Sequence, residues 1–228
     1  MDNRLKFIAG LVSIGCSLAD IGTDHAYLPI FLSANNICKK IIATDIRKKP
    51  LLVAKKNVEK SGAQNIELRL CDGLSGIKQN EVDEIVIAGM GGEVISGIIS
   101  KAEWLNNSKY KLILQPMSHT EDLRKFLVSN GFSIEKEQAV ISDNRIYSVM
   151  QVRFCNKKET LDDLFFYVGM LPCNLGEAEI KYINWRRKVL FERAQKIAKV
   201  NAKQIEYKHL LKIVKQIDEL LGNEQKCH

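Results

Sequence analysis

The chain has 228 residues, of which 46% are hydrophobic and 27% charged, and it carries a net charge of +7 at neutral pH. These values suit a single large globular domain, or one domain with an appendage, that has enough apolar residues for a core. The first residues lead into a mixed segment and no apolar run approaches the roughly 20 residues of a membrane helix, so we expect no signal peptide, no membrane association and a cytoplasmic protein.

The first part of the chain alternates strand-like apolar runs with helical patterns, which is typical of a parallel sheet covered by helices. The predicted strands cover residues 17–22, 39–46, 66–73, 82–92 and 110–117, and the predicted helices residues 26–36, 50–62 and 94–101. Ser118 and Glu121 then stand in the S-x-x-E spacing of a capping box. This spacing predicts that a further helix starts there and covers residues 120–130.

The pattern changes after that helix. Residues 132–141 and 145–154 are two strand-like runs that only the short turn S-D-N separates, so they are expected to be antiparallel neighbours. Parallel βα units followed by an antiparallel hairpin are the order of a class I methyltransferase domain, whereas a nicotinamide-binding Rossmann domain would continue with another parallel strand. We therefore predict an α/β, Rossmann-like methyltransferase domain over residues 1–155.

Residues 156–228 are predicted to form a separate helical domain. Apolar residues recur there at helical spacing in two stripes that do not share a register, which favours two helices packed as an antiparallel coiled-coil hairpin over one continuous helix. From Lys181 to Lys215 the chain has eleven Lys or Arg against two acids, a net charge of +9. Such a dense basic segment favours nucleic acid as the partner. The alternative is a solvated, lysine-rich helix face.

The cysteines give no sign of a zinc site or a disulfide framework. They are scattered without C-x-x-C pairs, so we predict reduced thiols and no bound metal. The six residues are Cys16, Cys38, Cys71, Cys155, Cys173 and Cys227.

Acidic residues end three successive predicted strands, at the edge where an open α/β sheet binds its ligand. Asp20 can hold a charged amine or order a water molecule. Asp45 follows Gly22 by 23 residues, the distance at which an acid commonly accepts hydrogen bonds from ribose hydroxyls, and Asp72 can receive an adenine amine. Together the three acids predict a cofactor that contains adenosine. For each acid alone, a solvated loop residue or a helix cap is the alternative.

The turn D-I-G-T-D-H-A-Y narrows the choice of cofactor. It keeps Gly22, but Asp24 and Ala26 stand where a G-x-G-x-G turn has its other glycines. A dinucleotide needs these glycines for its pyrophosphate, which an added carboxylate would repel. S-adenosylmethionine has no phosphate and carries a positive sulfonium and ammonium, so it is the cofactor that we predict.

Two further segments are candidates for holding a flat base against the methyl donor. In I-V-I-A-G-M-G-G-E, the glycines give a bare backbone and Met90 an apolar surface, although a tight turn before a helix explains the glycines equally well. Gln115 and Pro116 end the fifth strand, where they either complete a base pocket or form a strand-end turn. His25 either stacks or hydrogen-bonds near the base, or caps the helix that follows Gly22.

The blocks D-I-G-T-D-H-A-Y-L-P-I, A-T-D-I, C-D-G-L, I-A-G-M-G-G and L-I-L-Q-P-M, in this order and spacing, resemble the bacterial tRNA (adenine-22-N1)-methyltransferase family. The resemblance covers essentially the whole chain, including the C-terminal helical hairpin. It implies methyl transfer from S-adenosylmethionine to N1 of an adenine in the D-arm region of tRNA. The cofactor site that it implies consists of Asp20, Gly22, Asp45, Ile46, Asp72, Gly73, Ala88, Gly89, Met90 and Gly91.

On the substrate side, the resemblance places Asp24, His25 and Arg4 near the adenine. Methylation leaves the ring cationic, and Asp24 is the candidate for stabilising that charge. The basic hairpin is expected to hold tRNA phosphates with Arg186, Arg187 and Lys188, and the protein is expected to be a monomer. The alternatives are a methyltransferase that acts on another RNA or a small molecule, and a non-catalytic RNA-binding protein that retains the fold.

Overall fold

The structure is a computed structural model and describes residues 1–157, 161–170, 175–200 and 203–224. The chain divides into two compact units, Met1–Glu159 and Thr160–His228, which we call the sheet unit and the helical unit. Across the described ranges, each helix is too short or too polar to span a membrane.

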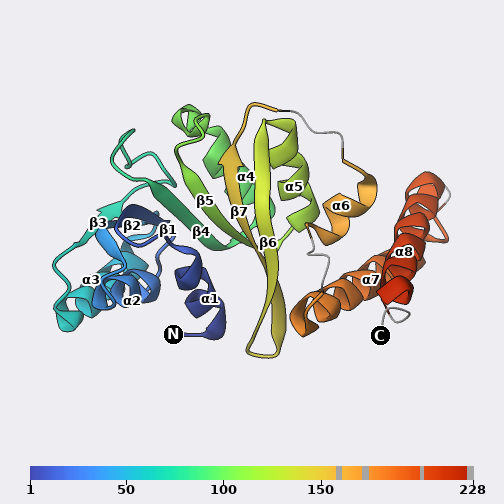
Figure 1. The fold of residues 1–228 in the computed structure, drawn as a ribbon, viewed down its shortest axis with the longest axis horizontal. Helices are drawn as coiled ribbons and strands as arrows, with labels where there is room; N and C mark the ends of the chain where they lie inside the picture. Colours follow the sequence, from blue (N-terminus) through green and yellow to red (C-terminus); the bar gives the residue numbers. More distant parts are fainter. Residues whose placement is uncertain (158–160, 171–174, 201–202, 225–228) are drawn as a thin grey trace. The chain divides into compact units, whose positions relative to one another are not determined.

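The sheet unit contains a seven-stranded sheet with the strand order β3-β2-β1-β4-β5-β7-β6 (Figure 1). Strands β1 to β5 are parallel, and β7 pairs antiparallel with both β5 and β6. This order confirms the predicted parallel sheet closed by an antiparallel hairpin. The strands are β1 (Cys16–Ile21), β2 (Cys38–Asp45), β3 (Ile66–Leu70), β4 (Glu84–Gly91), β5 (Lys111–Ser118), β6 (Phe132–Ser142) and β7 (Arg145–Phe154).

Helices cover both faces of this sheet (Figure 1). Helices α1 (Asn3–Leu11), α2 (Tyr27–Ala34) and α3 (Lys48–Ser61) contact one another along one face. Helix α4 (Gly92–Ser100) contacts α5 (Thr120–Ser129) and the short 3-10 helix η1 (Glu103–Leu105) along the other.

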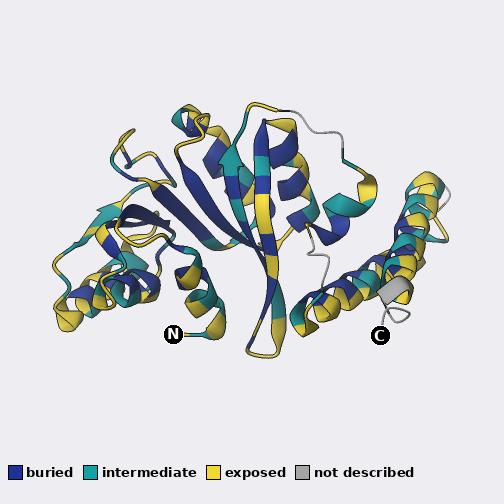
Figure 2. Cartoon of the chain, viewed as in Figure 1, coloured by how far each residue is buried: buried dark blue, intermediate teal, exposed yellow. Residues whose placement is uncertain are grey.

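The apolar pattern of each strand explains its place in the sheet. All six residues of β1 are buried, because this strand lies between two neighbours and beneath helices on both faces (Figure 2).

The β6–β7 hairpin turns through Asp143 and Asn144, whose φ angles of 49° and 60° are both left-handed. Two left-handed residues form the turn that matches the twist of a two-residue hairpin.

Two predictions about helix ends were wrong or incomplete. Helix α1 was not predicted, and its N-cap residue is Asp2, whose side chain accepts a hydrogen bond from Leu5 N at 2.7 Å. The predicted capping box does not start α5: His119 is the N-cap residue, with a left-handed φ of 52° and no side-chain capping bond. Ser118 is instead the last residue of β5, where it pairs with Gly91 of β4. Pairing in the sheet takes it away from the capping position.

The helical unit contains α6 (Asp163–Val168), α7 (Glu177–Ile197) and α8 (Gln204–Glu224). Two ion pairs set the direction of α7 against α8: Arg187 contacts Asp218 and Arg193 contacts Glu206. As the residue number rises on α7 it falls on α8, so the helices are antiparallel. The hairpin was therefore the correct alternative, and one continuous helix was wrong.

The helical unit has a core of its own, formed by the apolar stripes seen in the sequence. Its buried members come from all three helices, and the opposite faces of α7 and α8 are exposed (Figure 2). The buried residues are Tyr167, Val168, Ile183, Leu190, Ala194, Leu210, Ile213, Val214 and Ile217.

Candidate functional site

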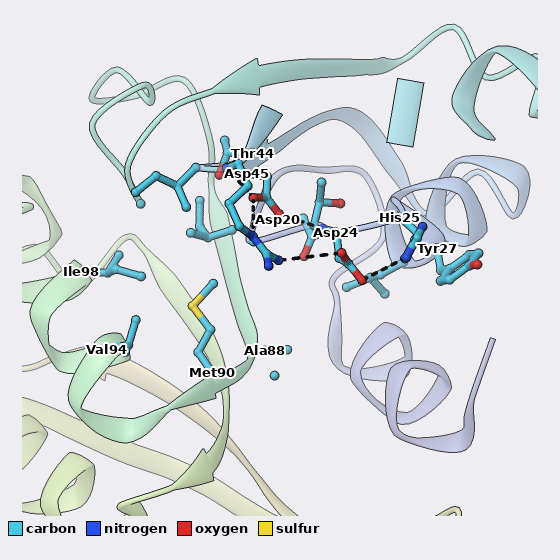
Figure 3. A pocket seen from close by; sticks show the side chains of 18 of the residues that line it. Asp20, Asp24, His25, Tyr27, Thr44, Asp45, Ala88, Met90, Val94 and Ile98 are labelled. Carbon is cyan, nitrogen blue, oxygen red and sulfur yellow. Dashed lines mark hydrogen bonds and ion pairs between the residues drawn. The ribbon is translucent and has the colours of Figure 1, made fainter. Parts of the chain in front are cut away.

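A cavity of about 620 Å³ opens at the carboxyl ends of β1 to β4 (Figure 3). This volume lies in the range of small-molecule and cofactor pockets. Five carboxylates line the cavity, against two arginines and one histidine, so its walls favour a cationic ligand. The charged lining residues are Asp2, Arg4, Asp20, Asp24, His25, Asp45, Arg47 and Asp72.

The turn after β1 has the backbone of a glycine-rich loop, although it contains one glycine. Gly22, Asp24 and Ala26 have φ angles of 75°, 51° and 58°, so all three are left-handed. An alanine in this region costs about 1 kcal/mol, which the surrounding contacts must offset. The amides of Gly22 and Thr23 both donate to the carbonyl of Thr44 at 2.8 Å. These bonds fix the turn against the end of β2.

The three predicted acids lie at three adjacent strand ends and line the same cavity. Asp20 is the last residue but one of β1 and is buried, and burial raises the pKa of its carboxyl from the ordinary 3.8 to about 6. Asp45 ends β2 and is also buried; its carboxylate accepts from the amides of Arg47 at 2.8 Å and of Asp24 at 3.3 Å. Asp72 follows β3, is exposed and forms an ion pair with Lys101.

An apolar wall faces these acids. Met90, Val94 and Ile98 lie on one side of the cavity, and Asp20, Asp24 and Asp45 lie on the other (Figure 3). A Cβ atom at Gly22 would stand 2.1 Å from the Cε atom of Met90. Gly22 is thus required for its left-handed backbone, whereas a Cβ atom there would displace only the flexible end of the Met90 side chain.

Asp24 and His25 lie next to each other at the mouth of the cavity. Their side chains are about half exposed and form an ion-pair contact of 3.4 Å. The imidazole of His25 stacks on the ring of Tyr27, with centroids 5.4 Å apart and planes 25° apart. The backbone carbonyl of His25 accepts from the Asn57 side chain of α3 at 3.0 Å, which holds this part of the turn in place.

Most of the predicted residues of the sheet unit line the cavity, and three do not. Gly91 does not line it, and a Cβ atom there would face Ser118 of β5, at 3.2 Å from its Oγ. Pro116 is buried in β5, opposite Met90. Gln115 is fully buried, and its amide is bonded to Arg4, to the Gly89 backbone and to its own strand. The predicted contacts of Gln115 and Pro116 with a base are therefore corrected: both side chains lie inside the protein.

Of the predicted phosphate contacts of the helical unit, that of Arg186 needs the same correction. Arg186 is 6% exposed, and its Nε donates to the Tyr167 carbonyl at 3.1 Å, so it is part of the interior. Arg187 forms an ion pair with Asp218 of α8. Lys188, with a side chain that is 76% exposed, is the one of the three that extends into solvent.

Several lining residues were missed because their place depends on tertiary structure. Arg47 follows Asp45 along the chain, and its guanidinium lies 3.7 Å from the Asp45 carboxylate and 4.0 Å from that of Asp24. Its position next to the second strand-end acid was the available signal. The other missed lining residues are Asp2, Leu5, Ile21, Thr23, Tyr27, Leu28, Thr44, Cys71, Val94 and Ile98.

One cluster of possible metal ligands lies outside the cavity, as do the described cysteines except Cys71, which lines it. Glu93, His119 and Asp122 are exposed, with ligand atoms within 4.8 Å of one another. Of the cysteines, Cys173 and Cys227 lie outside the described residues. The four described cysteines are free, and Cys16 and Cys38 face each other across β1 and β2 with sulfur atoms 3.6 Å apart.

Residues 1–150 match the family described as "Methyltransferase domain". The tRNA (adenine(22)-N(1))-methyltransferase of Bacillus subtilis (strain 168) is 36% identical over 172 residues, which cover 75% of this chain and 72% of that protein.

Solved structures extend the similarity over both units. The crystal structure of the B. subtilis m1A22 tRNA methyltransferase TrmK has a TM-score of 0.84 at 29% identity, covering 95% of this chain and 98% of that one. M. capricolum TrmK, solved in complex with the cofactor product S-adenosyl-homocysteine, has a TM-score of 0.78 at 28% identity. That match covers 97% of this chain and 98% of the other.

Proposed function

The chain belongs to the bacterial tRNA (adenine(22)-N(1))-methyltransferase family, and we propose that its cavity is where a methyl group passes from S-adenosylmethionine to N1 of adenine 22 in tRNA. The observation that carries this proposal is the convergence of Asp20, Asp45 and Asp72 on one cavity beside a left-handed turn. That arrangement suits adenosine joined to a cationic chain and has no place for a pyrophosphate.

The strand order sets out the proposed cofactor site from one end to the other. β3, β2 and β1 are adjacent, so Asp72, Asp45 and Asp20 follow one another along the edge of the sheet. Asp72 is assigned to the adenine amine, buried Asp45 to the ribose hydroxyls and Asp20 to the ammonium of the methionine part. Gly22 and Gly73 give the backbone access to the ligand, and the Met90 side chain provides an apolar surface.

The cofactor supplies a methyl group that its sulfonium activates for transfer. The protein's contribution is then to hold the adenine in line, exclude water and stabilise the positive charge that the ring acquires. Asp24 is suited to the last role, because its half-exposed carboxylate lies at the mouth of the cavity. His25 and Tyr27 present stacked rings beside it, against which a base can lie. The methylated base can lose its proton to water.

The charge of the cavity selects the base over the tRNA backbone. Five carboxylates repel phosphates but not a neutral adenine. To enter, the target base must be exposed or turned out of its stack, as for other enzymes that act on bases. The phosphates must therefore be held elsewhere on the protein.

We assign that task to the outer face of α8 in the helical unit. Lys208, Lys212 and Lys215 are exposed and follow one another at spacings of four and three residues, which places them on one side of the helix. Lys208 and Lys212 form no ion pair with any described residue. Binding through such lysines releases counterions and is strongly salt-dependent. We place the whole activity in the cytoplasm, where tRNA is the substrate.

The test is incubation of the protein with radiolabelled S-adenosylmethionine and unmodified tRNA, followed by nucleoside analysis and mapping of the methylated position. The expected product is 1-methyladenosine at position 22, and a tRNA with guanosine at that position should accept no label. Label in another RNA would support the alternative substrate. Binding of the cofactor and of tRNA without methyl transfer would support the alternative of a non-catalytic RNA-binding protein.

A further inference from the structure

Gln115 joins three parts of the sheet unit through one side chain. It is fully buried at the end of β5. Its Oε1 accepts from Arg4 Nη1 of α1 at 2.7 Å and from the Gly89 amide of β4 at 3.1 Å. Its Nε2 donates to the Pro116 carbonyl at 2.8 Å, which fixes the orientation of the amide. The carbonyl oxygen therefore faces the two donors.

The bond to Gly89 supports an irregularity in β4. The pairing of β4 with β5 goes from Ala88 opposite Gln115 to Met90 opposite Pro116, so Gly89 is an extra residue, with a left-handed φ of 80°. A bulged residue loses its ladder partner. The Gln115 side chain replaces that partner for the Gly89 amide and so holds the segment that carries Met90 into the cavity.

The bond to Arg4 directs a positive charge into the same end of the cavity. The Arg4 side chain is 17% exposed, lines the cavity and lies 5.8 Å above the Tyr147 ring. Its charge acts on Asp20, where it opposes the rise in the pKa of that carboxyl that burial causes. The nearest carboxylate is that of Asp2, at 3.5 Å. Bonds to Gln115 and Asp2 leave three of the five guanidinium donors for a ligand.

The other two cations of the cavity lie beside acids in the turn after β1 and at the end of β2. His25 lies 3.4 Å from Asp24, and Arg47 lies 3.7 Å from Asp45 at the end of β2. Arg4 is held through Gln115 next to β4 and β5, whereas Asp72 follows β3. The two residues therefore lie toward opposite ends of the row of strands that borders the cavity. It is thus the cation at the end that we assigned to the methionine part of the cofactor.

We propose that Arg4, held by Gln115, binds the carboxylate of the methionine part of S-adenosylmethionine. Arg4 is then the residue by which the protein distinguishes the amino-acid end of its cofactor, and Gln115 is a positioning residue that acts through it. This inference rests on the proposed function. It replaces the sequence-based expectation that Arg4 faces the adenine.

The test compares two ligands by calorimetry: S-adenosylmethionine and its decarboxylated form, which keeps the ammonium and the sulfonium. The decarboxylated form carries one more net positive charge, so an acidic cavity without Arg4 should prefer it. The wild-type protein is expected to bind S-adenosylmethionine about tenfold to hundredfold more tightly, as for a charge-assisted hydrogen-bond pair. Arg4→Gln should abolish or invert this preference, and Gln115→Met should reduce it.

The preference is the ratio of the two dissociation constants measured on one variant. General damage to the cavity weakens both ligands and so leaves this ratio unchanged. Asp45→Asn serves as the matched control and should weaken both ligands equally. Equal binding of the two ligands by the wild-type protein, or an unaltered preference in Arg4→Gln, overturns the inference but leaves the proposed function in place. A raised KM for tRNA with unaltered cofactor preference assigns Arg4 to the tRNA instead. If the wild-type protein binds neither ligand, both proposals fail.

Discussion

The cavity of the sheet unit and the paired helices of the helical unit both gather charged side chains, but they hold them in different ways. In the cavity, residues far apart in the sequence, such as Asp20, Asp45 and Asp72, meet because their strands are neighbours. In the helical unit, three consecutive cations separate: Arg186 is buried, Arg187 pairs with Asp218, and Lys188 extends into solvent.

The difference follows from the geometry of the two elements. The carboxyl ends of parallel strands face one edge, so an acid at each end contributes to one site. On a helix, successive residues are about 100° apart, so adjacent cations point in different directions and residues three or four apart share a face. A dense run of charge on a helix therefore gives the sign of the partner but not the residues that touch it.

The strongest test of this comparison exchanges the sign of the charge on α8. We expect the triple change Lys208→Glu, Lys212→Glu and Lys215→Glu to weaken tRNA binding on the order of hundredfold or more at low salt, because three phosphate contacts become repulsive. Binding is measured by filter retention or fluorescence anisotropy, and the affinity for S-adenosylmethionine should not change.

A matched control makes the same change of charge on the sheet unit, at the exposed lysines Lys55, Lys56 and Lys60 of α3. If both triple variants lose tRNA binding equally, net charge and not the α8 face governs the interaction. If the α8 variant binds tRNA normally, the role assigned to this face is wrong.

A second prediction compares two acids within the cavity. Asp45→Asn is expected to raise the dissociation constant for S-adenosylmethionine by about tenfold or more, because a buried carboxylate loses charge-assisted hydrogen bonds to the ribose. Asp72→Asn should raise it by less than about threefold, because that side chain is 55% exposed and already paired with Lys101. Calorimetry measures both constants, and equal losses would contradict the assigned order of contacts.

A third prediction concerns pH. With the pKa of Asp20 raised to about 6, this carboxyl becomes neutral in the free protein as the pH falls below 6. An ammonium ligand binds the ionised form, so the affinity for S-adenosylmethionine should fall by about tenfold between pH 7 and pH 5. In Asp20→Asn, binding should be weaker at pH 7 and should change far less over this range.

The stability of the free protein should depend on pH in the opposite direction to cofactor binding: the Asp20 contribution should fall as the pH rises. The folded pKa lies above the ordinary value of 3.8, so the contribution of this group to stability is fully present below about pH 4 and is lost as the pH rises through 6. Urea unfolding of the wild type and of Asp20→Asn should therefore differ more at pH 7 than at pH 4. A constant difference between the two proteins would contradict the raised pKa.

The sequence by itself determined the succession of the parallel strands along the chain, the closing hairpin and the strand-end acids. Each of these depends on local patterns: an apolar run such as that of β1, a turn such as Asp143-Asn144, or an acid at the end of a run. Local signals were weaker at helix ends. Ser118 has the spacing of a cap, but pairing with Gly91 makes it part of β5.

Only the tertiary structure decided which charged side chains are exposed to a partner and which residues Gln115 connects. Whether Arg186 is buried depends on how α6 and α8 pack against α7, and the link from Arg4 through Gln115 to Gly89 joins residues as far as 111 positions apart. Such contacts leave no periodic signal, because they are made by single side chains across packed elements. The pattern of a sequence fixes which face of an element is buried, whereas the partner of a buried polar group is set by the packing of the whole unit.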